Sequence, residues 1–164
     1  VFLTLRAWMS AQTLGPLLDS HRDLLKPEAI WQIELGRTVT AAALGTAMQR
    51  HAALLDRMRV FHERYPFLVC TVSQVPPFDA SLTWPREVAG VPMDNYIAWM
   101  ASAFRISLLL GPAAAVPAGF TDDGLPVGLQ IVGRIRDDLG VLRLAAAFEQ
   151  ATGFGRRRPP LGAD

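Results

Sequence analysis

The chain has 164 residues, enough for one ordinary domain and too few for two of typical size. Hydrophobic residues make up 51% of it and charged residues 19%, a balance that excludes an intrinsically disordered chain. Its 16 basic and 15 acidic residues give a formal net charge of +1, so no overall field attracts nucleic acid or an anionic membrane. The single cysteine, Cys70, excludes an internal disulfide framework and a cysteine-rich zinc site.

No membrane span or targeting segment is expected. The longest apolar run, Ile106 to Phe120, contains two prolines and is too short for a spanning helix. The first 14 residues carry Arg6 and lack the basic-then-apolar order of a signal peptide. We therefore expect a cytoplasmic chain. The start at Val1 and the high apolar content are also expected of a piece cut from a larger protein.

Helical patterns fill residues 1–66, which form one predicted helical segment. Three helices are expected, over residues 2–14, 27–35 and 41–64. Gly15-Pro16 should end the first helix, because proline breaks a helix, and Gly36 should lie at the C-terminal end of the second. Thr40 can cap the third helix, and Pro66 follows its end.

Residues 67–155 form a predicted segment of strands and helices, and residues 156–164 a tail. Strands are expected at residues 67–72, 106–110, 113–116 and 127–132, with a turn at Asp122-Asp123-Gly124. Helices are expected from Asp94 to 104 and from Asp137 or Asp138 to Gly153, the latter with Leu139, Leu142, Ala146 and Phe148 inward. The first strand should be buried and parallel to its neighbour. A sheet flanked by helices predicts an α/β domain.

The histidines and the cysteine do not combine into a metal or catalytic site. His51 and His62 are eleven residues apart on the apolar stripe of one helix, about 16 Å by helical rise, so they cannot share a ligand. Both are expected to be partly buried core histidines. Cys70 lies in an apolar strand without a basic neighbour, which indicates an inert thiol. No glycine-rich nucleotide loop opens a helix. We predict no metal ion and no cofactor.

The most specific pattern is the string Gly-Leu-Pro-Val-Gly-Leu-Gln at residues 124–130. Together with Ala-Ala-Ala-Val-Pro-Ala-Gly-Phe at 113–120 and the helix at 145–149, it resembles the C-terminal portion of the amidase signature family. Further segments are similar to those of bacterial members: Ser73–Phe78, Tyr96–Met100 and Phe2–Trp8. The resemblance covers nearly the whole chain.

Two positions depart from the usual pattern of the family. Leu110 stands where the family usually has a glycine, with Gly111 displaced by one residue. Ser107 and Leu109 stand where an Asn or Thr is common. These departures affect the expected local backbone geometry and not the resemblance itself.

The resemblance implies the C-terminal part of a three-layer α/β/α amidase fold, with a mixed sheet flanked by helices. The family hydrolyses amides with a serine nucleophile, a second serine in a cis peptide and a lysine base, and backbone N–H groups hold the oxyanion. None of these roles carries over to this chain. Its one lysine, Lys26, precedes Pro27 at a helix start, and no two of its six serines are adjacent. In the family these groups lie N-terminal to this region, so we predict no catalytic residue here and no activity of the chain alone.

The long loop from Ser73 to Pro92 is the predicted substrate-binding segment. It follows the carboxyl end of a strand, where open α/β sheets bind ligands. Gln74 can hydrogen-bond an amide, and Phe78 and Trp84 can line an apolar acyl or aryl pocket. The alternative is that these aromatic side chains only seal the loop onto the core.

Three functions stay open. The favoured one is part of an amidase, which takes a small-molecule amide only when the N-terminal portion of the enzyme is present. We expect it to bind no nucleic acid and no membrane. The isolated chain is expected to self-associate through an exposed apolar face. The second is a non-catalytic α/β module that binds a partner through that face. The third is the A subunit of a glutamyl-tRNA amidotransferase, less favoured because the segment from Glu34 to Leu44 lacks the basic run expected there.

Overall fold

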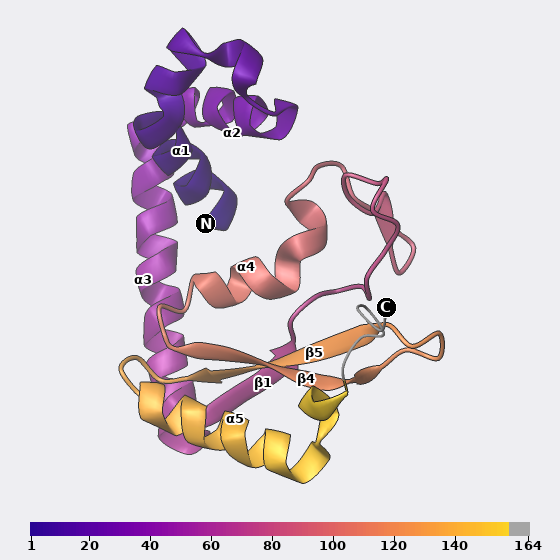
Figure 1. Ribbon diagram of the computed structural model, residues 1–164. Helices are drawn as coiled ribbons and strands as arrows, with labels where there is room; N and C mark the ends of the chain where they lie inside the picture. Colours follow the sequence, from indigo (N-terminus) through magenta and orange to yellow (C-terminus); the bar gives the residue numbers. More distant parts are fainter. Residues whose placement is uncertain (158–164) are drawn as a thin grey trace. The chain divides into compact units, whose positions relative to one another are not determined.

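A computed structural model describes residues 1–157 of the chain (Figure 1). The predicted tail from Arg158 onward lies outside the described residues. The helices are α1 (Phe2–Ser20), α2 (Pro27–Arg37), α3 (Ala41–Arg64), α4 (Ala101–Ser107) and α5 (Asp138–Thr152), with short 3-10 turns η1 (Arg22–Leu24), η2 (Ala98–Met100) and η3 (Phe154–Arg156). The strands are β1 (Phe67–Thr71), β2 (Glu87–Val88), β3 (Val91–Pro92), β4 (Ala113–Phe120) and β5 (Pro126–Gly133).

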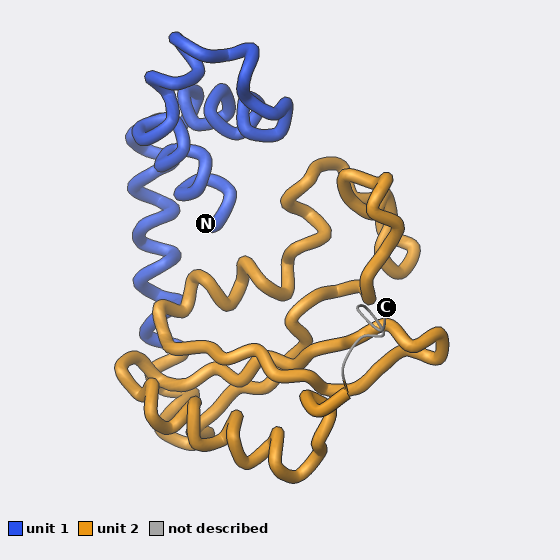
Figure 2. The backbone as a smooth tube through the Cα atoms, viewed as in Figure 1, with its two compact units in different colours: residues 1–57 blue, residues 58–164 orange. Residues whose placement is uncertain are grey.

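The chain divides into two compact units, Val1–Arg57 and Met58–Asp164 (Figure 2). The first unit holds α1, α2 and most of α3, and in the described part of the chain it contains no strand. The second unit holds the sheet, α4 and α5. Because α3 begins in one unit and ends in the other, the boundary falls inside a continuous helix.

Helix α1 is longer than its sequence pattern predicts. It continues through Pro16 to Ser20, so the prediction that Gly15-Pro16 ends it is wrong. Helix α2 packs along α1, and Arg37 donates hydrogen bonds to the Gly15 carbonyl at 3.3 Å and to the Asp19 carboxylate at 2.7 Å. These contacts come from a segment about 20 residues away, and they stabilise the last turns of α1 against the local cost of the proline.

Helix α3 confirms its predicted bounds. The Thr40 hydroxyl accepts a hydrogen bond from the Ala43 N–H at 3.2 Å, which caps the first turn. His62 is buried near the end of the helix, and its Nδ1 lies 3.0 Å from the Tyr65 carbonyl oxygen. This histidine is a hydrogen-bonded core residue, as its place on the apolar stripe indicates.

The main sheet has three strands in the order β1-β5-β4, and both pairs are antiparallel. In the first pair Phe67 lies opposite Gly133 and Thr71 lies opposite Leu129. The prediction of a buried parallel strand at 67–72 is therefore wrong. The direction of β1 is set by its pairing with β5, some sixty residues further along the chain, and no local pattern contains that information. β1 is an edge strand of the described sheet, and Val69 is exposed.

Helix α5 packs on one face of the sheet, around a core of Val116, Ile131, Val141 and Ala145. Phe148 contacts this core as predicted. Leu139 and Leu142, predicted to face inward, are 58% and 61% exposed, and Ala146 is exposed as well. The prediction is therefore right for Phe148 and wrong for the other three residues, which lie on the outer side of the helix. Asp137 caps the helix by accepting from the Gly140 N–H at 3.2 Å, and Gly153 ends it with φ +67°.

Helix α4 replaces a predicted strand. The run 106–110 is not extended, because α4 continues to Ser107 and a turn follows. A short apolar run is compatible with either structure, and packing decides between them. The cap before η2 and α4 is also shifted by one residue. Asn95, rather than the predicted Asp94, accepts hydrogen bonds from the Ile97 and Ala98 N–H groups at 3.0 and 3.2 Å.

The second unit is layered. Figure 1 shows α5 along one face of the sheet and α4 along the other, and Ser102 of α4 contacts Gln130, which alternates in β5 with the core-facing Leu129 and Ile131. The α/β class predicted from the sequence is confirmed. Among the described residues no helix is long and apolar enough to cross a membrane.

Candidate functional site

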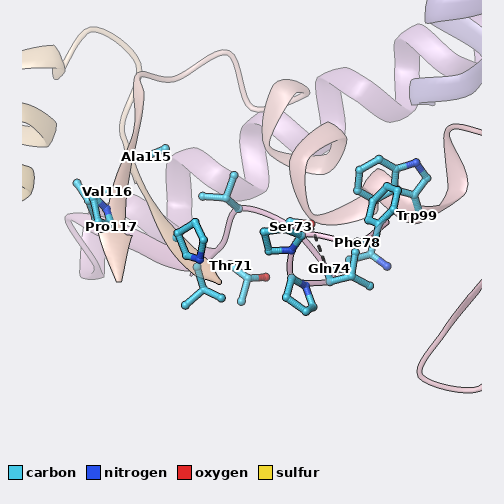
Figure 3. Close-up of a pocket in the computed structure, with 15 residues that line it drawn as sticks. Thr71, Ser73, Gln74, Phe78, Trp99, Ala115, Val116 and Pro117 are labelled. Atoms are coloured by element: carbon cyan, nitrogen blue, oxygen red, sulfur yellow. Dashed lines mark hydrogen bonds between the residues drawn. The ribbon is translucent and has the colours of Figure 1, made fainter. Parts of the chain in front are cut away.

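The second unit contains a cavity of about 690 Å³ at the edge of the sheet where β1 ends (Figure 3). Four segments line it: residues 71–78, Trp99, residues 115–117 of β4 and residues 126–128 of β5. Because β5 runs antiparallel to β1, its first residues meet the last residue of β1 at this edge. The cavity volume lies within the range of small-molecule sites.

The cavity wall is mainly apolar. Phe78 packs edge-to-face on Trp99, with ring centroids 5.4 Å apart and an interplanar angle of 89°. Figure 3 places this aromatic pair at one end of the cavity and Val116 with Pro117 at the other. No charged residue and no histidine lies in this lining, which falls wholly within the described residues. Such a wall favours an uncharged, apolar group.

A partly buried cluster of polar side chains adjoins the cavity. The Gln74 side-chain oxygen accepts a hydrogen bond from the Ser102 backbone N–H at 3.1 Å, and the Ser102 hydroxyl donates to the Val72 carbonyl at 3.0 Å. Gln130, 7% exposed, donates through its amide nitrogen to the Thr71 carbonyl at 2.7 Å and to the Ser102 carbonyl at 3.3 Å. The cluster joins α4 and β5 to the chain that leaves β1.

Trp84 lies in a different environment from Gln74 and Phe78. Its indole N–H donates to the Met93 carbonyl at 3.3 Å, and the Arg86 guanidinium lies 3.9 Å from its ring centroid. The ring also meets Tyr96 edge-to-face at 6.3 Å. These contacts hold the β2–β3 hairpin of the long loop together, and Trp84 is not part of the cavity lining.

A turn of the same loop is held by Asp79. Its carboxylate accepts a hydrogen bond from the Ser81 N–H at 2.8 Å. This backbone hydrogen bond, with a second one from the Ser81 hydroxyl, lowers the pKa of Asp79 below its usual value. The charged form therefore stabilises the turn at neutral pH.

The structure brings together two of the three predicted binding residues, Gln74 and Phe78. Sequence reasoning assigns no role to Trp99 or to the start of β5, although both lie in segments that carry the family resemblance. The serines near the cavity are engaged: Ser73 accepts from the Val75 N–H at 3.3 Å, and Ser102 donates as described. Within the described residues no three metal-ligating side chains gather.

Comparison with known proteins places this arrangement in a family. The sequence model of the Amidase family matches residues 15–142. The A subunit of the glutamyl-tRNA(Gln) amidotransferase of Thermodesulfovibrio yellowstonii is 37% identical over 101 residues, which are 60% of this chain and 19% of that protein. The acylamidase of Rhodococcus erythropolis is 32% identical over 121 residues, which are 74% of this chain and 25% of that protein.

Solved structures show the same fold. The crystal structure of a bacterial aryl acylamidase of the amidase signature family aligns with 95% of this chain and 34% of its own, with a TM-score of 0.75 and 24% identity. The matched region is thus between about a fifth and a third of the length of these relatives. The family match over most of the chain and the shared fold agree: the chain belongs to the Amidase family, the amidase signature enzymes.

Proposed function

We propose that the chain forms one wall of the substrate pocket of an enzyme that hydrolyses a carboxylic amide to an acid and an amine or ammonia. The observation that carries this proposal is the 690 Å³ cavity, lined by Gln74, Phe78 and Trp99 and otherwise by aliphatic, proline and small polar residues. A mainly apolar cavity with one side-chain amide suits an uncharged acyl or aryl amide.

The nucleophile and the general base come, in this proposal, from residues outside this chain. No acidic, basic or histidine side chain lines the cavity in the described residues, so nothing there can take the proton from a nucleophile. The hydroxyl groups of Ser73 and Ser102 hydrogen-bond to backbone groups, which do not act as a base. The chain contributes binding, and the chemistry is supplied elsewhere.

A titration of the purified chain with acetanilide tests the proposal. We expect saturable binding that shifts the NMR signals of the residues lining the cavity, without release of aniline. Phe78→Ala should weaken this binding, whereas Val60→Ala, an exposed position on α3, should not. An absence of binding would favour the non-catalytic module, and turnover abolished by a substitution within this chain would contradict the division of roles.

The sequence identity to the A subunit of the amidotransferase supports a second candidate function, in which the substrate is glutamine. Free glutamine carries an ammonium and a carboxylate, and burial of charges without partners is costly. The part of the pocket built by this chain offers no charged group, which favours an amide without charges. Competition between acetanilide and glutamine for the chain separates the two candidates.

A further inference from the structure

The carboxamide of Gln74 is held by one of its two ends. The atom that faces the Ser102 backbone N–H at 3.1 Å is the side-chain oxygen. A backbone N–H can only donate a hydrogen bond, so the side-chain atom opposite it has to be the amide oxygen and not the amide nitrogen. The orientation of the Gln74 amide therefore follows from its partner.

Ser102, the partner of Gln74, is itself held by two further hydrogen bonds. The Ser102 hydroxyl donates to the Val72 carbonyl, and the Ser102 carbonyl accepts from the Gln130 amide nitrogen. That nitrogen also donates to the Thr71 carbonyl. Since both of its partners are carbonyl oxygens, the orientation of the buried Gln130 amide is fixed by the same reasoning. Thr71 and Val72 lie two to three residues before Gln74. The hydrogen bonds to their carbonyls therefore hold the chain next to Gln74, and the bonds of Ser102 hold its partner.

The other end of the Gln74 carboxamide is the NH₂ group. Among the described residues it has no hydrogen-bond partner, and Gln74 lines the cavity. If the side chain rotated to offer its oxygen instead, the half-buried Ser102 N–H would lose its acceptor, which is unfavourable. The cluster thus leaves only a donor available to a ligand.

We propose that Gln74 is a specificity-determining residue that donates a hydrogen bond to the carbonyl oxygen of the bound amide, with Ser102 and Gln130 as its positioning residues. The inference rests on the proposed function, because it takes the cavity as the amide pocket. An amide presents a carbonyl acceptor and, in most cases, an N–H donor. A free glutamine side chain can pair with either, whereas Gln74 in this cluster pairs with the acceptor alone.

Three aromatic probes of similar size test this polarity: acetophenone accepts a hydrogen bond, aniline mainly donates one, and ethylbenzene does neither. Binding to the full chain is followed by NMR titration of the lining residues. We expect acetophenone to bind about two- to tenfold more tightly than ethylbenzene, the range expected for one hydrogen bond. Aniline should show no such advantage.

Two variants separate the hydrogen bond that Gln74 donates from the packing of its side chain. In Gln74→Glu one carboxylate oxygen still accepts from the Ser102 N–H, but no donor is left, so the preference should reverse toward aniline. In Gln130→Met the donor to the Thr71 and Ser102 carbonyls is lost, so the Ser102 backbone is held less firmly and the advantage of acetophenone over ethylbenzene should become smaller. Ser102→Ala removes only the hydroxyl contact and replaces Gln130→Met if that variant does not fold.

The outcomes distinguish this inference from the proposed function. If ethylbenzene and acetophenone bind equally, or if Gln74→Glu keeps the preference for acetophenone, the donor role is wrong while the pocket stands. If none of the three probes binds in the cavity, the proposed pocket and the donor role both fail. A preference for acetophenone that reverses in Gln74→Glu supports both.

Discussion

Gly36 of α2 lies so close to Ala7 of α1 that a Cβ at position 36 would stand 1.9 Å from the Ala7 carbonyl oxygen. The Ala11 Cβ would be 2.7 Å away. Both values are below any real van der Waals contact, and Ala7 is fully buried. Gly36 lies in the last turn of α2, at the C-terminal end of the helix as the sequence predicts, and it also permits the close packing of two helices.

Gly36→Ala should destabilise the chain by about 1–3 kcal/mol, because the added methyl group forces α1 and α2 apart. The matched control is Gly45→Ala in α3, where a Cβ would meet no atom within 4 Å. That variant should be neutral or stabilising by up to about 1 kcal/mol, because alanine favours a helix. Urea unfolding followed by circular dichroism measures both, and equal midpoints for the two variants would contradict the packing argument.

Leu110→Gly should be more stable than Leu110→Ala by about 1 kcal/mol, because residues with a Cβ are strained in the left-handed region. Leu110 has φ +57° and is 60% exposed, so little packing is lost in either variant. Thermal unfolding of the two variants checks this, and a more stable alanine variant would show that residue 110 leaves the left-handed region without cost.

The elements that the sequence predicts correctly are those whose signals are local. Helix α3 has a capping Thr40 and a terminating Pro66, and α5 has Asp137 and Gly153 at its two ends. The errors concern elements that depend on distant partners. The direction of β1 depends on β5, and the extension of α1 past Pro16 depends on Arg37. A window of neighbouring residues does not contain those contacts.

The residues of the candidate site also fall into those with a local sequence signal and those that depend on distant contacts. Gln74 and Phe78 can be found from the sequence because they lie in a long loop after a strand, which is a local pattern. The hydrogen bonds from Ser102 and Gln130 join residues that are 28 to 59 positions apart, so neither the cluster nor the orientation of Gln74 could be predicted. Trp99 could not be predicted as a lining residue, because nothing in its own segment indicates that it packs against Phe78.

Asp137→Ala should lower the free energy of unfolding by about 1 kcal/mol, because the Asp137 carboxylate accepts a hydrogen bond from the Gly140 N–H at the first turn of α5. Asp138→Ala serves as the control, since Asp138 lies in the same first turn and has only the weaker interaction with the helix dipole. Chemical denaturation at neutral pH compares the two. A greater loss in Asp138→Ala would mean that the cap contributes less than the dipole.

The outer side of α5 should make the purified chain self-associate. Leu139 and Leu142 are more than half exposed on this helix, and exposed apolar stripes favour association. The double substitution Leu139→Lys and Leu142→Lys should shift the chain toward monomer in sedimentation velocity. Gln150→Lys adds a charge at another exposed position of α5 and should leave association unchanged. A monomeric unmodified chain at high concentration would contradict this prediction.

Phe78 and Trp84 are both predicted from the sequence to line the substrate pocket, and kinetics of a full-length protein with the proposed amidase activity can separate them. Phe78 lines the cavity and is partly exposed, so Phe78→Ala removes apolar contact worth about 1–2 kcal/mol. If this contact is equal in the ground and transition states, KM for benzanilide rises roughly 5- to 30-fold while kcat changes little. KM for acetamide, which is too small to reach the wall, should stay the same.

Trp84→Ala is the matched control, because this ring packs on Arg86 and Tyr96 within the hairpin and does not line the cavity. Its loss should lower thermal stability and affect benzanilide and acetamide alike. If Trp84→Ala instead raises KM for benzanilide alone, the ring contacts the substrate in the whole enzyme and the sequence-based prediction for both aromatics is right. If Phe78→Ala lowers kcat equally for both amides, Phe78 supports the loop and does not bind the substrate, and the pocket wall has to be sought elsewhere.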